Sequence, residues 1–176
     1  MSSSGLRWVV LLRGVNVGRH HRIAMPAFRS LLEGVGGRDV QTYVQSGNAV
    51  LSWDGSASEL EVATRAGLAA LGLDVPVLVR TGAELVRVHA QNPWRAQNLD
   101  PKLLHVAFLS GEPDPARLAA VDHAALLPER LAVGDRSLYL FHAGGVQRSK
   151  LARLSFGVDA TARNWTTVAT LAGLAG

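Results

Sequence analysis

Val40-Gln-Thr-Tyr-Val44 and Ala49-Val-Leu-Ser-Trp53 are two β-rich runs separated by the polar stretch Gln45-Ser-Gly-Asn48. Gly and Asn supply the positive φ angles of tight turns, so the stretch predicts a hairpin. Outward from it, residues 8–12 and 75–79 are apolar runs typical of buried strands. A stretch with helical spacing lies between each run and the hairpin. The first half is therefore predicted to be β-α-β-β-α-β.

Local signals mark the ends of these helices. Pro26 suits the first turn of the first helix, and the Gly36-Gly37 pair suits its end. Ser58 and Glu61 have the spacing of a capping box, which predicts the start of the second helix there.

The second half repeats this pattern more weakly. Thr81 and Glu84 predict a short capped helix that Asn92-Pro93-Trp94 ends. Residues 103–109 predict a strand, Asp114-Pro115 opens a helix, and residues 131–133 are expected to pair with 138–141. Helical segments are expected from about Ser149 and from Thr161, the latter with Thr161 as its cap and with Trp165, Val168 and Ala172 buried.

Together these patterns predict an α+β protein of two ferredoxin-like, split β-α-β halves with antiparallel sheets. A doubly wound parallel sheet is not expected, because both hairpins join neighbouring strands directly. The predicted domains are residues 1–80, a helical connector at 81–101, and a second α+β half at 102–176.

Composition narrows the class of protein. The 176 residues are 48% hydrophobic and 18% charged, and they include no cysteine, which excludes disulfides and thiolate zinc sites. The start, Met-Ser-Ser-Ser-Gly-Leu-Arg, lacks the features of a signal peptide, and the longest apolar run is too short for a membrane span. We therefore expect a cytoplasmic protein.

The net charge of +4 is unevenly distributed. Lys and Arg number 6 against 2 Asp and Glu in residues 1–53, 7 against 10 in residues 54–130, and 5 against 2 in residues 131–176. If the two basic ends meet in space, they would form an electropositive surface that attracts phosphates or other anions. The opposing interpretation is that the arginines reflect the coding bias of a GC-rich genome, since 16 of the 18 basic residues are Arg.

Four polar clusters, each at the end of an apolar element, are the candidate ligand-binding residues because scaffolds present binding groups there. Each also has a plain structural interpretation: glycines and Asn shaping a connection, a hairpin turn, a helix cap with solvated charges, and an Arg tied to a carboxylate. The clusters comprise Arg13, Gly14, Asn16 and Gly18; Gln45, Ser46 and Asn48; Arg148, Ser149 and Lys150; and Arg163 and Asn164.

No chemistry can be assigned to these clusters. The first matches neither a dinucleotide fingerprint nor a Walker loop, and Ser46 lacks a nucleophile elbow. His20-His21 lies between Arg19 and Arg22, where positive charge disfavours a metal cation, and the other histidines show no ligand spacing. We predict no catalytic residue, metal or cofactor.

The chain also resembles a bacterial domain-of-unknown-function family. The resemblance is carried by Leu11-Leu-Arg-Gly-Val-Asn-Val-Gly18, Tyr43-Val-Gln-Ser-Gly-Asn48, Arg148-Ser-Lys-Leu151 and Thr161-Ala-Arg-Asn-Trp165. It implies a cytosolic protein of two ferredoxin-like halves and implies no biochemical role.

Three functions follow as hypotheses. The first is binding of a phosphate-bearing or other anionic ligand, a nucleotide or nucleic acid, at the donor-rich loops of the basic ends. The second is an enzyme acting on a small anionic substrate, with Lys150 or Ser46 as the reactive group, although no general base is identified. The third is a structural or protein-interaction domain whose clusters only shape loops. Ferredoxin-like scaffolds host many functions, so the fold does not choose among them.

Overall fold

The computed structural model describes residues 6–176. The expectation that the chain carries no signal peptide concerns residues 1–7, and most of these lie outside the described residues. The chain divides into two compact units. Unit 1 comprises Met1–Arg87 and Thr170–Gly176, and unit 2 comprises Val88–Ala169.

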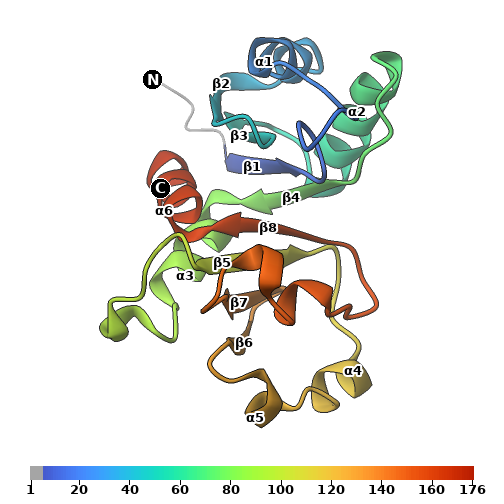
Figure 1. Cartoon of the computed structure of the whole chain (residues 1–176). Coiled ribbons are helices and arrows are strands. Elements are labelled where there is room, and N and C mark those ends of the chain that lie inside the picture. The colour runs from blue at the N-terminus through green and yellow to red at the C-terminus, as the bar shows by residue number, and fades with distance from the viewer. Residues whose placement is uncertain (1–5) are drawn as a thin grey trace. The chain divides into compact units, whose positions relative to one another are not determined.

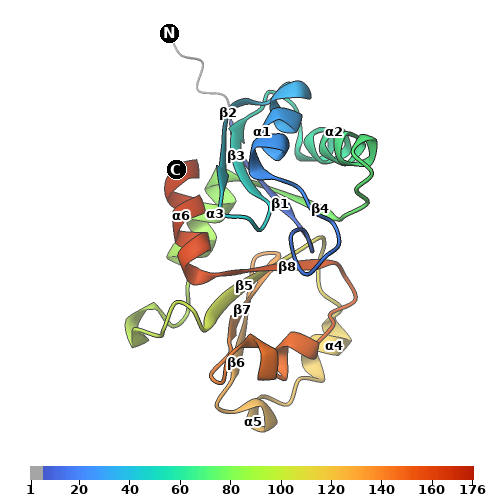
Figure 2. The ribbon, with the colours of Figure 1, turned by 45° about the horizontal axis from the view of Figure 1, so that its top comes forward.

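Unit 1 is built on a four-stranded antiparallel sheet with the strand order β2-β3-β1-β4. Helices α1 and α2 lie side by side on one face of it (Figures 1 and 2). This arrangement confirms the predicted ferredoxin-like fold. The elements are β1 (Arg7–Leu12), α1 (Met25–Gly34), β2 (Arg38–Tyr43), β3 (Asn48–Ser52), α2 (Ala57–Ala70) and β4 (Val77–Thr81).

The core of unit 1 lies between this sheet and the two helices. Alternate residues of β1, namely Trp8, Val10 and Leu12, face the helices because successive side chains of a strand point to opposite faces. They pack in one cluster with Phe28 of α1 and Leu60 of α2. Burial of this apolar face stabilises the unit.

The predicted hairpin between β2 and β3 is confirmed. The residues with positive φ angles in its turn differ from those expected. β2 pairs with β3 from Tyr43 opposite Asn48. Gly47 has a φ of 78°, as predicted, but the other left-handed residue is Val44, at 49°, and not Asn48. Asn48 instead begins β3 and is buried there.

The capping box of α2 lies two residues before the predicted one. The Ser56 hydroxyl accepts a hydrogen bond from the Glu59 N–H at 3.2 Å, and Glu59 Oε2 accepts one from the Ser56 N–H at 2.7 Å. Ser56 and Ser58 both precede a Glu at the required spacing, and the chain uses the first. The predicted Ser58 cap is therefore wrong.

Helix α3 (Gly82–Ala90) begins in unit 1, and α6 (Trp165–Ala175) ends there. The predicted Thr81 capping box is confirmed, because Thr81 and Glu84 exchange two hydrogen bonds at 2.6 and 3.1 Å. A Cβ atom on Gly82 would lie 2.5 Å from the Ala175 carbonyl oxygen. Glycine is therefore required where the start of α3 meets the end of α6.

Unit 2 contains a second antiparallel sheet, with the order β6-β7-β5-β8, equivalent to that of unit 1. Apolar side chains of β5, β6 and β7 pack with Leu126, Leu151 and Phe156 on one face. The elements are β5 (Leu104–Leu109), α4 (Pro115–Ala119), α5 (His123–Leu126), β6 (Arg130–Gly134), β7 (Ser137–Phe141) and β8 (Ala160–Asn164), with short 3₁₀ helices η1 (Arg95–Gln97), η2 (Val146–Arg148) and η3 (Leu151–Arg153).

Two predictions for the end of the chain are wrong. The helix expected from Ser149 is replaced by the three-residue helices η2 and η3. The helix expected from Thr161 begins at Trp165, and Thr161 lies in strand β8, opposite Phe108 of β5. Pairing with β5 therefore determines the conformation of residues 160–164.

Candidate functional site

The first two predicted clusters meet in unit 1. The loop after β1 contains the first cluster, and the β2–β3 turn contains the second. The Leu12 N–H donates to the Gly47 carbonyl at 2.8 Å, and Asn16 Nδ2 donates to the Gln45 carbonyl at 2.7 Å. A Cβ atom on Gly47 would lie 2.7 Å from Leu12 Cβ and from Val15 Cγ2. The glycine thus permits the close contact between loop and turn.

The asparagine side chains of both clusters bond to the chain's own groups. Besides Gln45, Asn16 donates to the Ile23 carbonyl at 2.8 Å and accepts from the Ile23 N–H at 3.0 Å. Asn48 Nδ2 donates to the Tyr43 carbonyl at 3.0 Å and to Ser46 Oγ at 2.9 Å. Both amides therefore shape the loop and the turn, as the structural interpretation predicts.

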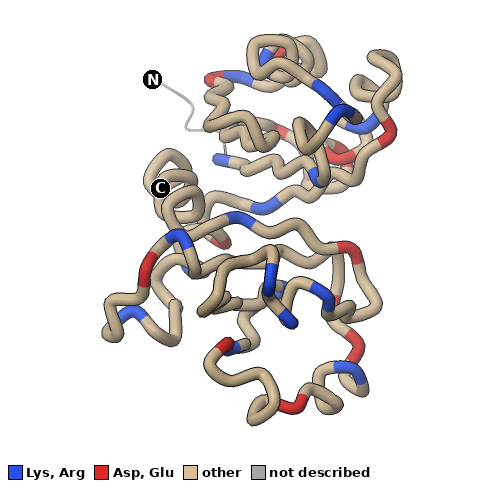
Figure 3. Tube along the Cα trace, in the orientation of Figure 1, with Lys and Arg blue, Asp and Glu red and all other residues tan. Residues whose placement is uncertain are grey.

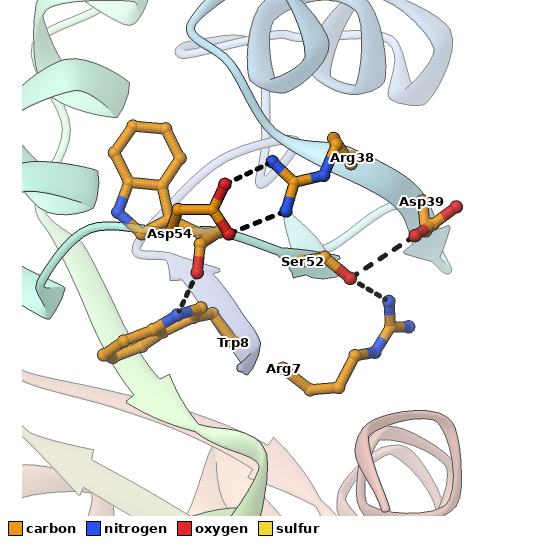
Figure 4. A network of polar contacts seen from close by, with 7 residues as sticks. Arg7, Trp8, Arg38, Asp39, Ser52 and Asp54 are labelled. Atoms are coloured by element: carbon orange, nitrogen blue, oxygen red, sulfur yellow. Dashed lines mark hydrogen bonds and ion pairs between the residues drawn. The ribbon is translucent and has the colours of Figure 1, made fainter. Parts of the chain in front are cut away.

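The arginines of residues 6–53 fall into two groups. In the first group, cations bond to neighbours at the end of the sheet where β1 and β2 begin and β3 ends (Figure 4). Arg38 forms a two-pronged ion pair with Asp54 at 2.7 Å, which lowers the pKa of Asp54, and Arg7 donates to Ser52 Oγ at 3.2 Å. Arg29 likewise pairs with Glu33 on α1 at 2.8 Å.

The second group lies on residues 13–22, which we call the basic loop. Arg13, Arg19 and Arg22 are exposed on it, as are His20 and His21, and the loop contains no acidic residue. Arg22 donates to the Gly18 carbonyl at 2.8 Å. Figure 3 shows the basic positions on this loop, which follows β1. The positive charge of residues 6–53 is thus concentrated on the basic loop.

The third predicted cluster lies in unit 2, around a buried carboxylate. Glu129 Oε2 accepts hydrogen bonds from the backbone N–H groups of Lys150, at 3.0 Å, and Leu151, at 3.4 Å. The Lys150 amine donates to the Ala125 carbonyl at 2.9 Å, and Arg148 is exposed. The anion bound by these amides in the structure is therefore Glu129 itself.

Ser149 contacts His142, one of the histidines that show no ligand spacing in the sequence. Its hydroxyl lies 2.7 Å from His142 Nδ1, and the His142 ring meets the His105 ring edge to face at 5.0 Å. Burial lowers the pKa of both histidines, that of His105 to about 4, with the charge of His142 as a smaller cause. A neutral histidine beside a serine is the geometry of a nucleophile and its base.

This Ser149–His142 pair is enclosed, however. Both side chains are buried, and the cavity of about 380 Å³ that Lys150 lines does not include either of them. Ser149 Oγ also accepts the Leu151 N–H at 3.1 Å. The contact therefore fixes the chain before η3.

In the fourth cluster both side chains bond within unit 2. Arg163 is buried on β8 and donates to Thr161 Oγ1 at 2.7 Å and to the Ala162 carbonyl at 2.9 Å. Burial lowers the pKa of Arg163 to about 10. Asn164, and not Thr161, caps α6, since its Oδ1 accepts the Thr167 N–H at 2.9 Å.

Two searches of residues 6–176 concern metal ions and membranes. No group of three or more His, Asp or Glu side chains among these residues is placed to hold a metal ion. In the same part of the chain, no helix combines the length and the apolar character needed to cross a bilayer.

Two ferredoxin-like units of the same strand order define the class: an α+β protein with a duplicated architecture. The chain belongs to the family described as protein of unknown function DUF1697, whose model matches residues 6–139. The third and fourth clusters lie beyond that match.

A solved structure has the same fold. Conserved bacterial protein SP0830 from Streptococcus pneumoniae superposes with a TM-score of 0.77 at 18% identity, covering 97% of this chain and 99% of that one. The search of curated proteins gave no match.

Proposed function

We propose that this protein binds a phosphate-bearing polyanion, a nucleic acid or a nucleotide, through the basic loop of unit 1. The observation that carries the proposal is the separation of the arginines of residues 6–53 into two groups. Arg29 and Arg38 are neutralised by carboxylates, whereas Arg19 and Arg22 are exposed on a loop without an acidic residue. Guanidinium groups bind phosphate oxygens in bidentate geometry.

The internal bonding of the loop supports the same function. Asn16 and Gly47 hold the loop against the hairpin turn, so the arginines project from a fixed backbone. A preorganised loop loses less conformational entropy when it binds. A cytoplasmic location, expected from the cysteine-free composition, belongs to the same proposal.

The test is binding of a labelled single-stranded oligonucleotide, and of a mononucleotide, at low and moderate salt. We expect affinity for the oligonucleotide to fall steeply with salt, because bound phosphates release counterions. Replacing Arg19 and Arg22 together by Gln should weaken binding about tenfold at low salt and reduce the logarithmic salt slope by up to about 1.4, or 0.7 per contact.

The matched control replaces Arg29 and Arg65 by Gln. Both are about half exposed, both pair with a Glu on a helix of the same unit, and the change in net charge is identical. The control should bind like the wild type. An equal loss in both variants would show that only net charge matters, and no binding at low salt would refute the proposal. A thermal melt of each variant establishes that it is folded.

The enzyme hypothesis receives less support from the geometry. The Lys150 amine donates to a backbone carbonyl, and Ser46 Oγ accepts from Asn48. Neither contact supplies the general base that a reactive amine or hydroxyl needs, so no second function is advanced.

A further inference from the structure

A pocket of about 510 Å³ lies in unit 2, between the last residues of α3, the segment 91–101 and the first residue of α6. None of the four clusters lines it. Its volume is within the range of small-molecule sites.

Two aromatic groups line the pocket. The rings of His89 and Trp165 stack with their centroids 4.9 Å apart and an interplanar angle of 17°, which makes a flat surface. Trp94 is the second group, and the Arg130 guanidinium lies 5.0 Å from its ring centroid. Gln97 Oε1 accepts from Arg130 at 2.6 Å, so the cation that covers Trp94 is itself held in place.

The pocket also has a donor group without an acceptor, on a buried side chain. Asn92 lines the pocket and is only 6% exposed. Its Oδ1 accepts the Trp94 N–H at 2.9 Å, which leaves its NH₂ group directed elsewhere. Within residues 6–176 that NH₂ has no hydrogen-bond acceptor, nor do the indole N–H groups of Trp94 and Trp165. The NH₂ group itself is accessible, although the side chain is buried, so an acceptor on a ligand in the pocket can bond to it without breaking an internal hydrogen bond.

We propose that this pocket binds the base of a nucleoside or nucleotide. A nucleobase is planar and carries ring nitrogens and carbonyl oxygens, so it can stack on the aromatic surface and accept hydrogen bonds from Asn92. Stacking on aromatic side chains is the usual way in which proteins hold unpaired bases. Arg95, an exposed residue of the pocket lining, supplies a cation for a phosphate.

The inference goes beyond the proposed function, because it concerns unit 2 and requires no phosphate. The two can fail separately. A neutral nucleoside should bind the pocket with little salt dependence, whereas binding by the basic loop depends on charge.

The test is titration of the ¹⁵N-labelled protein with adenosine and with cytidine, followed through its four indole N–H signals. Trp→Phe variants assign the signals. We expect saturable shifts of the Trp94 and Trp165 signals and of the Asn92 NH₂ signals, with those of Trp8 and Trp53 unmoved. Asn92→Asp keeps the acceptor for the Trp94 N–H but removes the donors, and it should weaken binding about tenfold.

Two controls make the result decisive. Trp53→Phe, in unit 1, should bind nucleosides like the wild type, whereas Trp165→Leu should lose binding while remaining folded by its amide spectrum. Benzene, which offers no acceptor, should bind more weakly than either nucleoside. The proposal is overturned if nucleosides shift neither pocket indole, or if Asn92→Asp binds them unchanged.

Discussion

At the scale of single residues, Gly47 determines how the basic loop meets the hairpin turn. Its φ of 78° matches that of Gly72, at 76°, but of the two only Gly47 has neighbours within 3 Å of the place that a Cβ atom would occupy. Gly47→Ala should cost about 2–4 kcal/mol, and Gly72→Ala about 1 kcal/mol, because the second bears only the cost of the left-handed backbone. Urea unfolding of both variants measures the difference, and equal losses would contradict the role of the contact.

The histidine pair predicts a dependence of stability on pH. Because burial lowers the pKa of His105 to about 4, the folded protein binds fewer protons than the unfolded chain, whose histidines titrate near pH 6.5. This contribution to stability is complete above about pH 6.5 and is lost as the pH falls toward 4. His142, whose pKa is also lowered, acts in the same direction.

The corresponding measurement is the thermal midpoint from about pH 7 to about pH 5, above the range in which most carboxylates titrate. We expect the midpoint to fall, by about 2–4 °C for each kcal/mol lost. His105→Gln should flatten the profile. An unchanged slope in that variant would assign the pH dependence to other groups.

The sequence did not predict which groups single side chains contact. It identified Asn16, Asn48 and Ser149 as donors or caps, but not their partners. Ser149 bonds His142, and the backbone amides of Lys150 and Leu151 bond Glu129, 21 and 22 residues earlier in the chain. Trp94 and Trp165, which line one pocket, are likewise far apart in the sequence. Such pairings depend on tertiary contacts, which local sequence does not encode.

At the scale of elements, the start of α2 provides a direct comparison of two serines. Ser56 forms the capping box, whereas Ser58 lies exposed in the first turn. Ser56→Ala should destabilise the protein by about 1 kcal/mol, and Ser58→Ala should have an effect within about 0.5 kcal/mol of zero. Chemical unfolding of the two variants measures these changes. A larger loss of unfolding free energy in Ser58→Ala than in Ser56→Ala would support Ser58 as the cap, as predicted from the sequence.

Elements with strong local signals were predictable, and others were not. The β2–β3 and β6–β7 hairpins and the cap of α3 follow from turn residues and short-range spacing. Strand β8, Ala160-Thr-Ala-Arg-Asn164, has a single β-branched residue. Its strand conformation comes from pairing with β5, more than 50 residues earlier, so propensity gave the wrong answer.

At the scale of the whole molecule, unit 1 combines residues from both ends of the described chain, which contact each other. The start of α3 contacts the end of α6 at Gly82, and Arg7 donates to the Leu174 carbonyl at 3.4 Å. Gly82→Ala should therefore push α6 away and cost about 1–3 kcal/mol.

Gly173→Ala is the matched control, on the same helix α6, where a Cβ atom would meet no neighbour within 4 Å. It should stabilise the protein by about 0.5–1 kcal/mol, because alanine favours helix more than glycine does. Thermal unfolding distinguishes the two signs. Stabilisation by both substitutions would show that the contact at Gly82 is not tight.

The division of the chain between the units also sets an order for biosynthesis. Unit 2 is one continuous segment, whereas unit 1 needs residues made before that segment and residues made after it. At about 5–20 residues per second, the first segment of unit 1 is complete at Arg87 roughly 4–18 s before the last helical residues of that unit are translated. During that interval unit 2 can fold on the ribosome while unit 1 still lacks a piece. Nascent chains stalled before residue 170 should thus carry an incomplete first unit, which is a substrate for chaperones.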